Sequence, residues 1–231
     1  MKLQKETEES KTPHGRWYGD ACGTAFAMEL VGERWSLLIV RELMLGARRF
    51  SDIRASLPGI SAKVLTERLG SLEDAGVLVR RQLPPPVKAQ VYELTEWGYA
   101  AEPLIQEAGR WAAQSSAHDP TLPLSNVSLM LSMRTMVDKA RIGEIEGTIG
   151  FAIGEDGFIA EPGEGVLPIR RGDPAEADVI FRAPIAAVIA GGLYAGVAWE
   201  ELERGVGLSI EGDRDLALRY ASMFSLPPKI G

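Results

Sequence analysis

The chain has 231 residues, of which 45% are hydrophobic and 25% charged, with a formal net charge of −7 at pH 7. This composition is that of a folded globular protein and excludes a disordered or collagen-like chain. No apolar run reaches the roughly 18 residues needed to span a bilayer, and the polar start MKLQKETEESK is unlike a secretory signal, so we expect a cytoplasmic protein without a membrane partner. The single cysteine, Cys22, cannot form an internal disulfide, which agrees with a reducing compartment.

The charge is distributed unevenly along the chain. Residues 1–118 contain 15 Lys and Arg and 15 Asp and Glu, whereas residues 119–231 contain 10 and 17. The whole acidic excess therefore lies in the second half. A neutral first half argues against nonspecific, charge-driven binding of nucleic acid, but it permits a local basic patch that binds a particular sequence.

The length predicts two domains of similar size, since about 100–200 residues per domain is usual. The stretch QSSAHDPTLPLSN, residues 114–126, combines Ser, Pro, Asp and Asn with little apolar periodicity, which is typical of a linker. We therefore predict a mobile tail at 1–19, a first domain at 20–114, a linker at 115–126 and a second domain at 127–231.

The first half is predicted to be mainly helical. Apolar periodicity and turn residues predict helices at 21–31, 34–45, 50–57 and 61–75, a hairpin of 77–83 with 91–94, and a helix at 96–113. In GISAKVLTERLGSLEDAGVLVRR the spacing of Leu65, Leu69 and Leu72 puts them on one packed stripe, and Ser61 can cap the helix. The order of helix, turn, helix and two-stranded ribbon indicates a winged helix-turn-helix, whose second helix fits the major groove of DNA.

The predicted DNA-binding residues lie on the free face of that second helix, before the short helix that precedes it, and along the wing: Ser61, Ala62, Lys63, Thr66, Glu67, Arg68, Arg49, Arg80, Arg81 and Lys88. The wing cations suit phosphate contacts. Arg68 is at the edge of the packed stripe, so an internal ion pair is an equal alternative. Glu67 could accept from cytosine or only keep the face soluble, and Arg49 could simply be solvated.

Several motifs occur in order: LVGERW, LMLGARRFSDI, LPGISAKVLTERLGSLEDAGVLVRR and VYELTEWG. With Cys22 before them, they resemble the HxlR-type branch of winged-helix bacterial transcription regulators. The resemblance implies a homodimer on double-stranded DNA, with helices 21–31 and 96–113 at the interface, and two-fold symmetry implies an inverted-repeat operator. The interface candidates are Phe26, Leu30, Leu104, Ile105 and Trp111.

Cys22 has two interpretations. In some members of this family a cysteine at its place senses oxidants or electrophiles, whereas an apolar-flanked thiol elsewhere is often a small packed residue. The sequence departs from the family at Gly23, where proline is common.

The second half is predicted to be an α+β domain. We expect strands at 147–153, 158–161, 166–170 and 177–181, with a tight turn at Asp156-Gly157. A helix opened by Pro184, a short helix at Trp199, a strand and a helix capped by Asp213 follow. This order, and GLSIEGDRDLALRYASMF in particular, resembles the sterol-carrier-protein-2-like (SCP2-like) domain.

That resemblance implies a curved sheet and helices around an apolar tunnel for a lipid, acyl or other hydrophobic ligand. The predicted lining consists of large apolar side chains: Val188, Ile189, Leu193, Trp199, Leu202, Met223 and Phe224. Arg182 or Tyr194 could hold a head group. A fully packed core is the alternative for all of them.

No enzymatic function is expected. His14 and His118 lack neighbouring Cys, Asp or Glu at metal-ligand spacing, and no phosphate-binding loop is present, so we predict no metal and no cofactor. The sequence thus predicts a DNA-binding transcriptional regulator controlled by a hydrophobic small molecule in its second domain. Two alternatives remain, a second domain that only stabilises the dimer and a lipid carrier without regulation.

Overall fold

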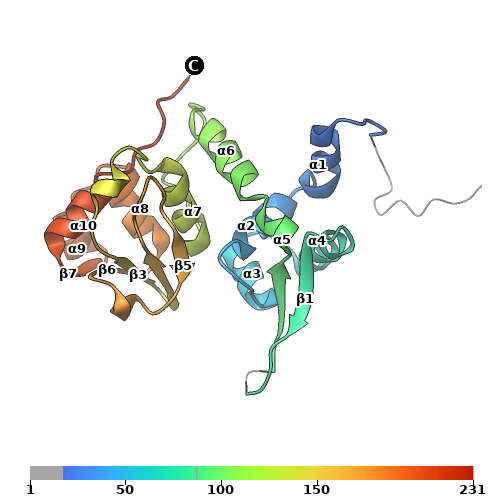
Figure 1. Ribbon diagram of the computed structural model, residues 1–231, viewed down its shortest axis with the longest axis horizontal. Coiled ribbons are helices and arrows are strands. Elements are labelled where there is room, and N and C mark those ends of the chain that lie inside the picture. The colour runs from blue at the N-terminus through green and yellow to red at the C-terminus, as the bar shows by residue number, and fades with distance from the viewer. Residues whose placement is uncertain (1–17, 87, 231) are drawn as a thin grey trace, which may run out of the picture.

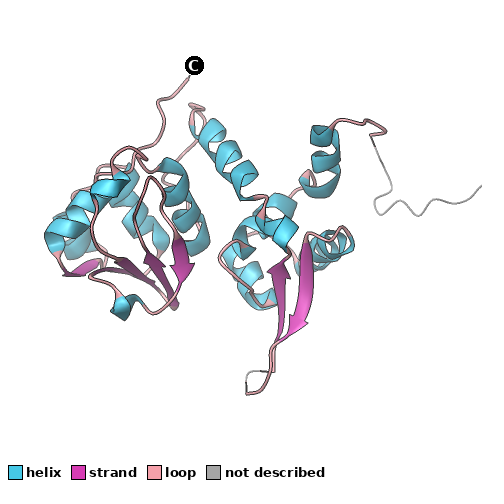
Figure 2. Ribbon diagram, in the orientation of Figure 1, coloured by secondary structure: helices cyan, strands magenta, loops and turns pink. Residues whose placement is uncertain are grey.

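The computed structural model describes residues 18–86 and 88–230, so the predicted tail at 1–19 lies almost wholly outside the described residues. The protein has two parts (Figure 1). The first is helical with a protruding β-hairpin, and the second combines helices with a sheet (Figure 2).

The first part has the predicted helix order with a hairpin after the fourth helix. In chain order its elements are α1 (Gly23–Val31), α2 (Ser36–Leu43), α3 (Phe50–Ser56), α4 (Ala62–Asp74), β1 (Leu78–Gln82), β2 (Gln90–Leu94), α5 (Glu96–Tyr99) and α6 (Glu102–Ala113). Its core is formed by apolar side chains of α2, α3, α4 and the hairpin, including Ile39, Leu43, Ile53, Leu65, Leu69, Leu72 and Leu78. The stripe predicted on α4 is therefore confirmed.

The helix predicted at 96–113 is wrong in one respect, because the structure breaks it into α5 and α6. Pro103, in the first turn of α6, has no N–H to continue a helix from the preceding turn. Thr95 caps α5 by accepting a hydrogen bond from the Gly98 N–H. A Cβ on Gly98 would lie 2.1 Å from the Val77 carbonyl oxygen, so α5 can approach the base of the wing only with glycine there.

The second part is an α+β unit. Its elements are α7 (Asn126–Met136), η1 (Ile142–Glu144), β3 (Ile149–Ile153), β4 (Asp156–Ala160), β5 (Ile169–Arg171), η2 (Pro174–Glu176), β6 (Val179–Ala183), α8 (Ala186–Tyr194), α9 (Trp199–Gly205), β7 (Ser209–Gly212) and α10 (Arg214–Ala221). The strands form one sheet in the order β5-β4-β3-β6-β7. β3 and β6 are parallel, and the other neighbours are antiparallel.

An aromatic cluster holds the helices on one face of this sheet. The rings of Phe151 and Phe181, on the paired strands β3 and β6, stack with centroids 5.6 Å apart. Tyr220 of α10 lies 6.1 Å from Phe151, and Trp199 of α9 lies 5.4 Å from Phe181. On the opposite face η2 packs closely, since a Cβ on Gly150 would lie 2.7 Å from the Pro174 carbonyl oxygen.

Three predictions about the second part need correction. The linker predicted at 115–126 ends inside a helix that was not predicted, α7, which Ser125 caps by accepting from the Ser128 N–H. The β3–β4 turn lies at residues 154–155, where Gly154 has a φ of 57°, and not at Asp156-Gly157, which are strand residues. Helix α8 begins at Ala186, so Pro184 precedes it.

The two parts pack against each other through α2, α6 and α7, and their buried apolar residues form one continuous core. Residues near the C-terminus secure the end of α6, because Lys229 Nζ donates to the carbonyl oxygens of Ala113, Ser115 and His118. Among the described residues, no helix is long and apolar enough to cross a membrane.

Candidate functional site

Helix α4 presents a polar, exposed face opposite its packed stripe. Ser61 begins the helix by accepting a hydrogen bond from the Val64 N–H at 3.2 Å. After it Ala62, Lys63, Thr66 and Glu67 are exposed, and the Lys63 side chain retains 85% of its accessible surface. No large apolar side chain covers this face, so it can enter a groove without losing packing in the core.

The polar groups of this face have weak internal partners. Lys63 Nζ lies 3.9 Å from Glu67 Oε1, and the Thr66 hydroxyl donates to the Ala62 carbonyl at 2.9 Å. An exposed pair of this kind contributes little to stability, so a DNA ligand could replace it at small cost. Arg68 differs, because its Nη2 is 2.8 Å from Glu33 Oε2 and the side chain is largely covered. The structure therefore has the internal ion pair that was the alternative for Arg68.

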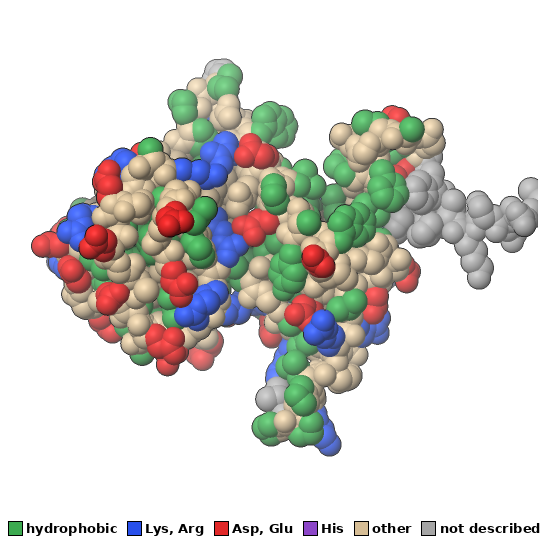
Figure 3. Space-filling view, viewed as in Figure 1, with side chains coloured by type: hydrophobic (Ala, Val, Ile, Leu, Met, Phe, Trp, Pro, Cys, Tyr) green, Lys and Arg blue, Asp and Glu red, His purple; other side chains and the backbone are tan. Residues whose placement is uncertain are grey.

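The wing cations do not all face the same way. Arg80 and Arg81 are successive residues of β1 and so point to opposite faces of the hairpin. Arg80 Nη2 lies 2.6 Å from Glu73 Oε2 at the end of α4, which raises the pKa of Arg80 through that hydrogen bond and charge, whereas Arg81 Nε lies 3.0 Å from Glu93. The protruding hairpin and its basic side chains are visible in Figure 3.

Lys88, near the wing tip, and Arg49, before α3, are both exposed. Within residues 18–86 and 88–230 neither has a carboxylate partner, so both cations are available to phosphates. Ten residues predicted from the sequence to bind DNA are thus brought to the region of α4, the start of α3 and the wing. Arg68, Arg80 and Arg81 would each have to give up an internal ion pair to reach a phosphate.

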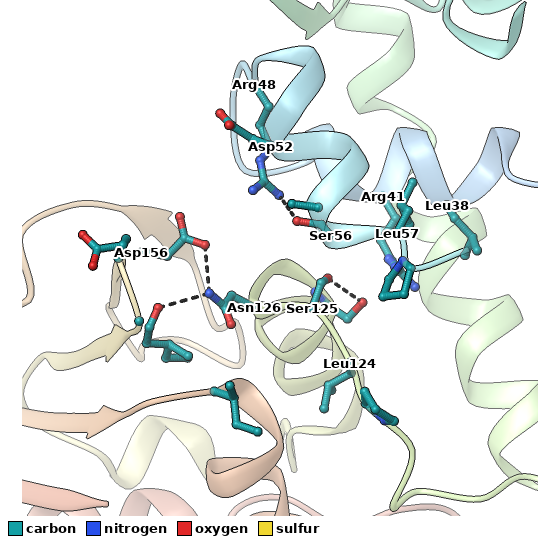
Figure 4. A pocket seen from close by; sticks show the side chains of 18 of the residues that line it. Leu38, Arg41, Arg48, Asp52, Ser56, Leu57, Leu124, Ser125, Asn126 and Asp156 are labelled. Atoms are coloured by element: carbon teal, nitrogen blue, oxygen red, sulfur yellow. Dashed lines mark hydrogen bonds between the residues drawn. The ribbon is translucent and has the colours of Figure 1, made fainter. Parts of the chain in front are cut away.

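The structure also contains a buried charged cluster that was not predicted. Glu42 of α2 is fully buried, and its carboxylate accepts from Arg41 Nη2 at 2.9 Å, Arg48 Nη1 at 3.0 Å and the Ser125 hydroxyl at 2.6 Å. Arg48 also donates to the Ser56 hydroxyl, as Figure 4 shows. Because Ser125 caps α7, this cluster ties the helix behind α4 to the first helix of the second part.

A signal for Glu42 was present in the sequence. In SLLIVREL, Glu42 follows Ile39 by three residues, which places an acid on the packed side of the helix. A carboxylate at such a position requires partners, and Arg41 and Arg48 are the nearby cations. The partner from the second part, Ser125, could not be found from this spacing.

Next to this cluster, a cavity of about 970 Å³ separates the two parts. Asn126 lines it and donates to the Ile153 carbonyl and to Asp156, which also pairs with Arg171 Nη1 at 2.6 Å (Figure 4). Burial alone would raise the pKa of Asp156, but the hydrogen bonds from Asn126 and Arg171 hold that pKa below its usual value. The cavity is therefore a cleft with mostly apolar walls and one charged wall.

The seven residues predicted to line a tunnel pack instead in the core of the second part. Val188, Ile189, Leu193, Leu202, Met223 and Phe224 are buried, and Trp199 packs on Phe181 and against Gly192. None of the seven lines this cleft, the cavity between α6, α7 and α8, or the hollow between α6 and residues 165–168. This arrangement agrees with the packed-core alternative at these positions.

The two candidate head-group residues have partners within the protein. Arg182 pairs with Glu211 at 2.9 Å, and Tyr194 accepts a hydrogen bond from the Ser132 hydroxyl at 2.9 Å. In the described part of the chain, no group of three or more His, Cys, Asp or Glu side chains could hold a metal ion.

An exposed second helix of a helix-turn-helix, followed by a basic hairpin, defines a winged-helix DNA-binding transcriptional regulator. Residues 30–120 match the family model described as HxlR-like helix-turn-helix. The chain belongs to this family. It is 43% identical over 89 residues to the HTH-type transcriptional regulator YvaP of Bacillus subtilis, covering 38% of this chain and 82% of that protein.

The HTH-type transcriptional regulator YodB of Bacillus subtilis is 45% identical over 89 residues, which cover 38% of this chain and 79% of YodB. The solved structure of reduced YodB aligns with a TM-score of 0.39 and 38% identity, covering 43% of this chain and all of that one. These matches concern the first part of the chain.

Cys22 is exposed at the start of α1, which argues against the packed alternative. The nearby backbone N–H groups of Thr24 and Ala25, together with the Thr24 hydroxyl, favour the thiolate and lower the pKa of the Cys22 thiol. Because the thiolate is the nucleophile, we expect iodoacetamide to alkylate Cys22 faster at pH 7 than it alkylates glutathione. Mass spectrometry of timed samples measures the alkylation rate, and the Cys22→Ser variant shows the background without this thiol. A rate at or below that of glutathione would contradict this expectation.

Proposed function

We propose that two copies of this protein bind an inverted-repeat operator, with α4 of each copy in a major groove and each wing along the backbone. The observation that carries this proposal is the exposed, polar face of α4, formed by Ala62, Lys63, Thr66 and Glu67. Selection of bound sequences from a random DNA duplex library tests it. We expect enriched sequences with two-fold symmetry and half-sites about one helical turn apart. Enrichment of an asymmetric single site would contradict the proposed arrangement.

The proposed dimer rests on apolar surface that the single chain leaves uncovered. None of the residues of α1 is buried, although the helix is rich in apolar residues, and a nine-residue helix is marginal without packing. On α6, Leu104 and Trp111 are exposed, Trp111 by 77%. Hydrophobic side chains gather over α1, α5 and α6 in Figure 3. Ile105, another candidate, packs instead against the core of its own chain.

We expect Trp111→Glu to shift the protein from dimer to monomer, because it puts a charge in the proposed apolar interface. Light scattering at micromolar concentration measures the mass. Val206→Glu is the control, since Val206 is also exposed but lies outside α1 and α6. A wild-type protein that is monomeric at concentrations that saturate DNA would contradict the dimer.

The wing is proposed to contact phosphates through Arg81 and Lys88, so replacing each with alanine should weaken binding to all DNA sequences. Each lost phosphate contact should reduce the slope of log affinity against log salt by about 1. Arg80→Ala should have a smaller effect, because Arg80 Nη2 lies 2.6 Å from Glu73, whereas Arg81 has a longer contact of 3.0 Å with Glu93 and a more exposed side chain. Fluorescence anisotropy with specific and random duplexes at several salt concentrations measures these slopes. Unchanged slopes in the Arg81 and Lys88 variants would show that the wing does not contact the DNA backbone.

We further propose that residues 20–114 and 127–231 act as two domains, and that the second is an SCP2-like domain through which a hydrophobic small molecule controls DNA affinity. A five-stranded sheet with helices packed on one face supports this proposal. The competing function is a scaffold that only stabilises the dimer. It is favoured because six of the seven predicted tunnel residues are buried in the core and Trp199 packs against it.

Control requires that the ligand bind one arrangement of the two domains more tightly than another. The test is to extract bound apolar molecules from the purified protein, identify them by mass spectrometry, and titrate each while measuring operator affinity. A bound molecule that leaves operator affinity unchanged would indicate a carrier without regulation. If no apolar molecule binds, the result supports the competing function, in which the second domain is a scaffold that only stabilises the dimer.

A further inference from the structure

We propose that the ligand site is a cavity between α6, α7 and α8, and that it takes a compact, uncharged apolar molecule carrying one hydrogen-bond acceptor oxygen. This inference rests on the ligand control proposed above and assigns that control a location outside the core of the second domain. The cavity has a volume of about 390 Å³, within the range of small-molecule sites. Its walls come from both parts of the chain.

The walls of this cavity are mostly apolar. Ile105 of α6, Leu131 and Met136 of α7, Ala190 of α8, and Leu124 from the connecting segment line it. Besides Ser132 and Tyr194, five lining residues are polar, and each has a partner within the protein. The Thr135 hydroxyl donates to the Leu131 carbonyl at 2.7 Å, and the Ser128 hydroxyl shares a hydrogen bond of 2.9 Å with the Ser125 hydroxyl. Arg41 is bound to the buried carboxylate of Glu42, and Asp119 accepts from Thr121 Oγ1 at 2.6 Å. The His118 ring lies 3.4 Å from Lys229 Nζ.

One polar pair in the wall is incompletely used. The hydroxyl groups of Ser132 and Tyr194 share a single hydrogen bond of 2.9 Å, so one of their two hydroxyl hydrogens has no acceptor among the described residues. Burial raises the pKa of Tyr194, which keeps the phenol protonated and able to donate. An acceptor oxygen on an otherwise apolar molecule would complete this pair, whereas a charged group would find no unpaired counterion.

The position of the cavity explains how an occupant could reach the DNA-binding part. Ile105 and Gly109, one turn apart on α6, face the cavity, while Leu104 and Trp111 are on the exposed side proposed for the dimer. Pro123, Leu124 and Arg41 line both this cavity and the cleft beside Glu42. A ligand here therefore contacts the dimer helix and the link between the two parts at once.

Gly109 offers a way to fill the cavity without disturbing the fold. A Cβ at Gly109 would meet no atom within 4 Å, and leucine favours a helix more than glycine does. Gly205, at the end of α9, also has open space around an added Cβ and lies outside the cavity lining, so Gly205→Leu is the matched control. Circular dichroism melting of both variants establishes that each is folded.

The neutral fluorescent probe N-phenyl-1-naphthylamine is titrated into the full chain, and bound probe is then displaced with benzophenone or with diphenylmethane, which lacks the carbonyl. We expect Gly109→Leu to weaken probe binding at least about tenfold and Gly205→Leu to leave it unchanged. Benzophenone should displace the probe roughly three- to tenfold better than diphenylmethane, and Tyr194→Phe should remove that preference.

Equal probe affinity in the wild type and a folded Gly109→Leu variant would overturn the proposed site. A benzophenone preference that survives Tyr194→Phe would overturn the role of the hydroxyl pair. Benzophenone is finally titrated during operator binding. If the binding results are as expected while operator affinity stays constant, the site stands and the ligand control proposed above fails.

Discussion

Replacing Glu42 with glutamine is expected to lower the free energy of unfolding by about 3–5 kcal/mol. The substitution keeps the shape of the side chain but leaves Arg41 and Arg48 without the carboxylate that both now contact. Arg48 is nearly buried, so its charge would lose its partner away from water. We expect the lower end of this range, because Arg41 retains 22% of its accessible surface. Urea unfolding followed by tryptophan fluorescence measures the change.

Glu161→Gln is the matched control, since Glu161 pairs with Arg170 at 3.0 Å but both side chains are about half exposed. This substitution should cost less than about 1 kcal/mol. Ser125→Ala should cost about 1–2 kcal/mol through the lost helix cap, and it should be strongly non-additive with Glu42→Gln because the two groups share a hydrogen bond of 2.6 Å. Additive effects would show that the buried cluster does not join the two parts of the chain.

The first part of the fold was predictable because its signals are local. The Leu65, Leu69 and Leu72 spacing, the Ser61 cap and the wing that follows α4 each depend on a few neighbouring residues. The same local reasoning failed at residues 96–113, where the break depends on Pro103 and on the close approach of Gly98 to Val77. That second cause joins residues far apart in the sequence and is invisible to periodicity.

The second part was less predictable for a related reason. The apolar residues of α7 are spread around the helix and interleaved with polar ones, so it lacks the clear polar face that marks an amphipathic helix, and it follows a Pro- and Ser-rich segment. From the sequence alone, apolar residues such as Val188 and Leu193 could equally line a tunnel or fill a core. In the structure both side chains are buried in the core. The cavity beside Tyr194 depends on how α6 packs against α7, which no local pattern encodes.

The exposed face of α4 provides the most direct test of DNA recognition. We expect Lys63→Ala and Thr66→Ala each to lower operator affinity by about 1–3 kcal/mol per half-site where the residue contacts a base. A two-fold dimer contains each substitution twice, so the loss across a whole operator should exceed that on a single half-site. Stability should change little, because both side chains lie on the exposed face and make only weak internal contacts.

Lys139→Ala is the control for Lys63→Ala, because it removes one exposed positive charge from the second part of the chain. It should leave operator affinity unchanged, since Lys139 is outside α4, α3 and the wing. Base contacts and phosphate contacts are separated by comparing the operator with a random duplex. A base contact at Lys63 lowers affinity for the operator alone, whereas a phosphate contact lowers both affinities equally. If Lys63→Ala and Thr66→Ala both bind the operator as tightly as the wild type, then the exposed face of α4 is not the surface that reads DNA.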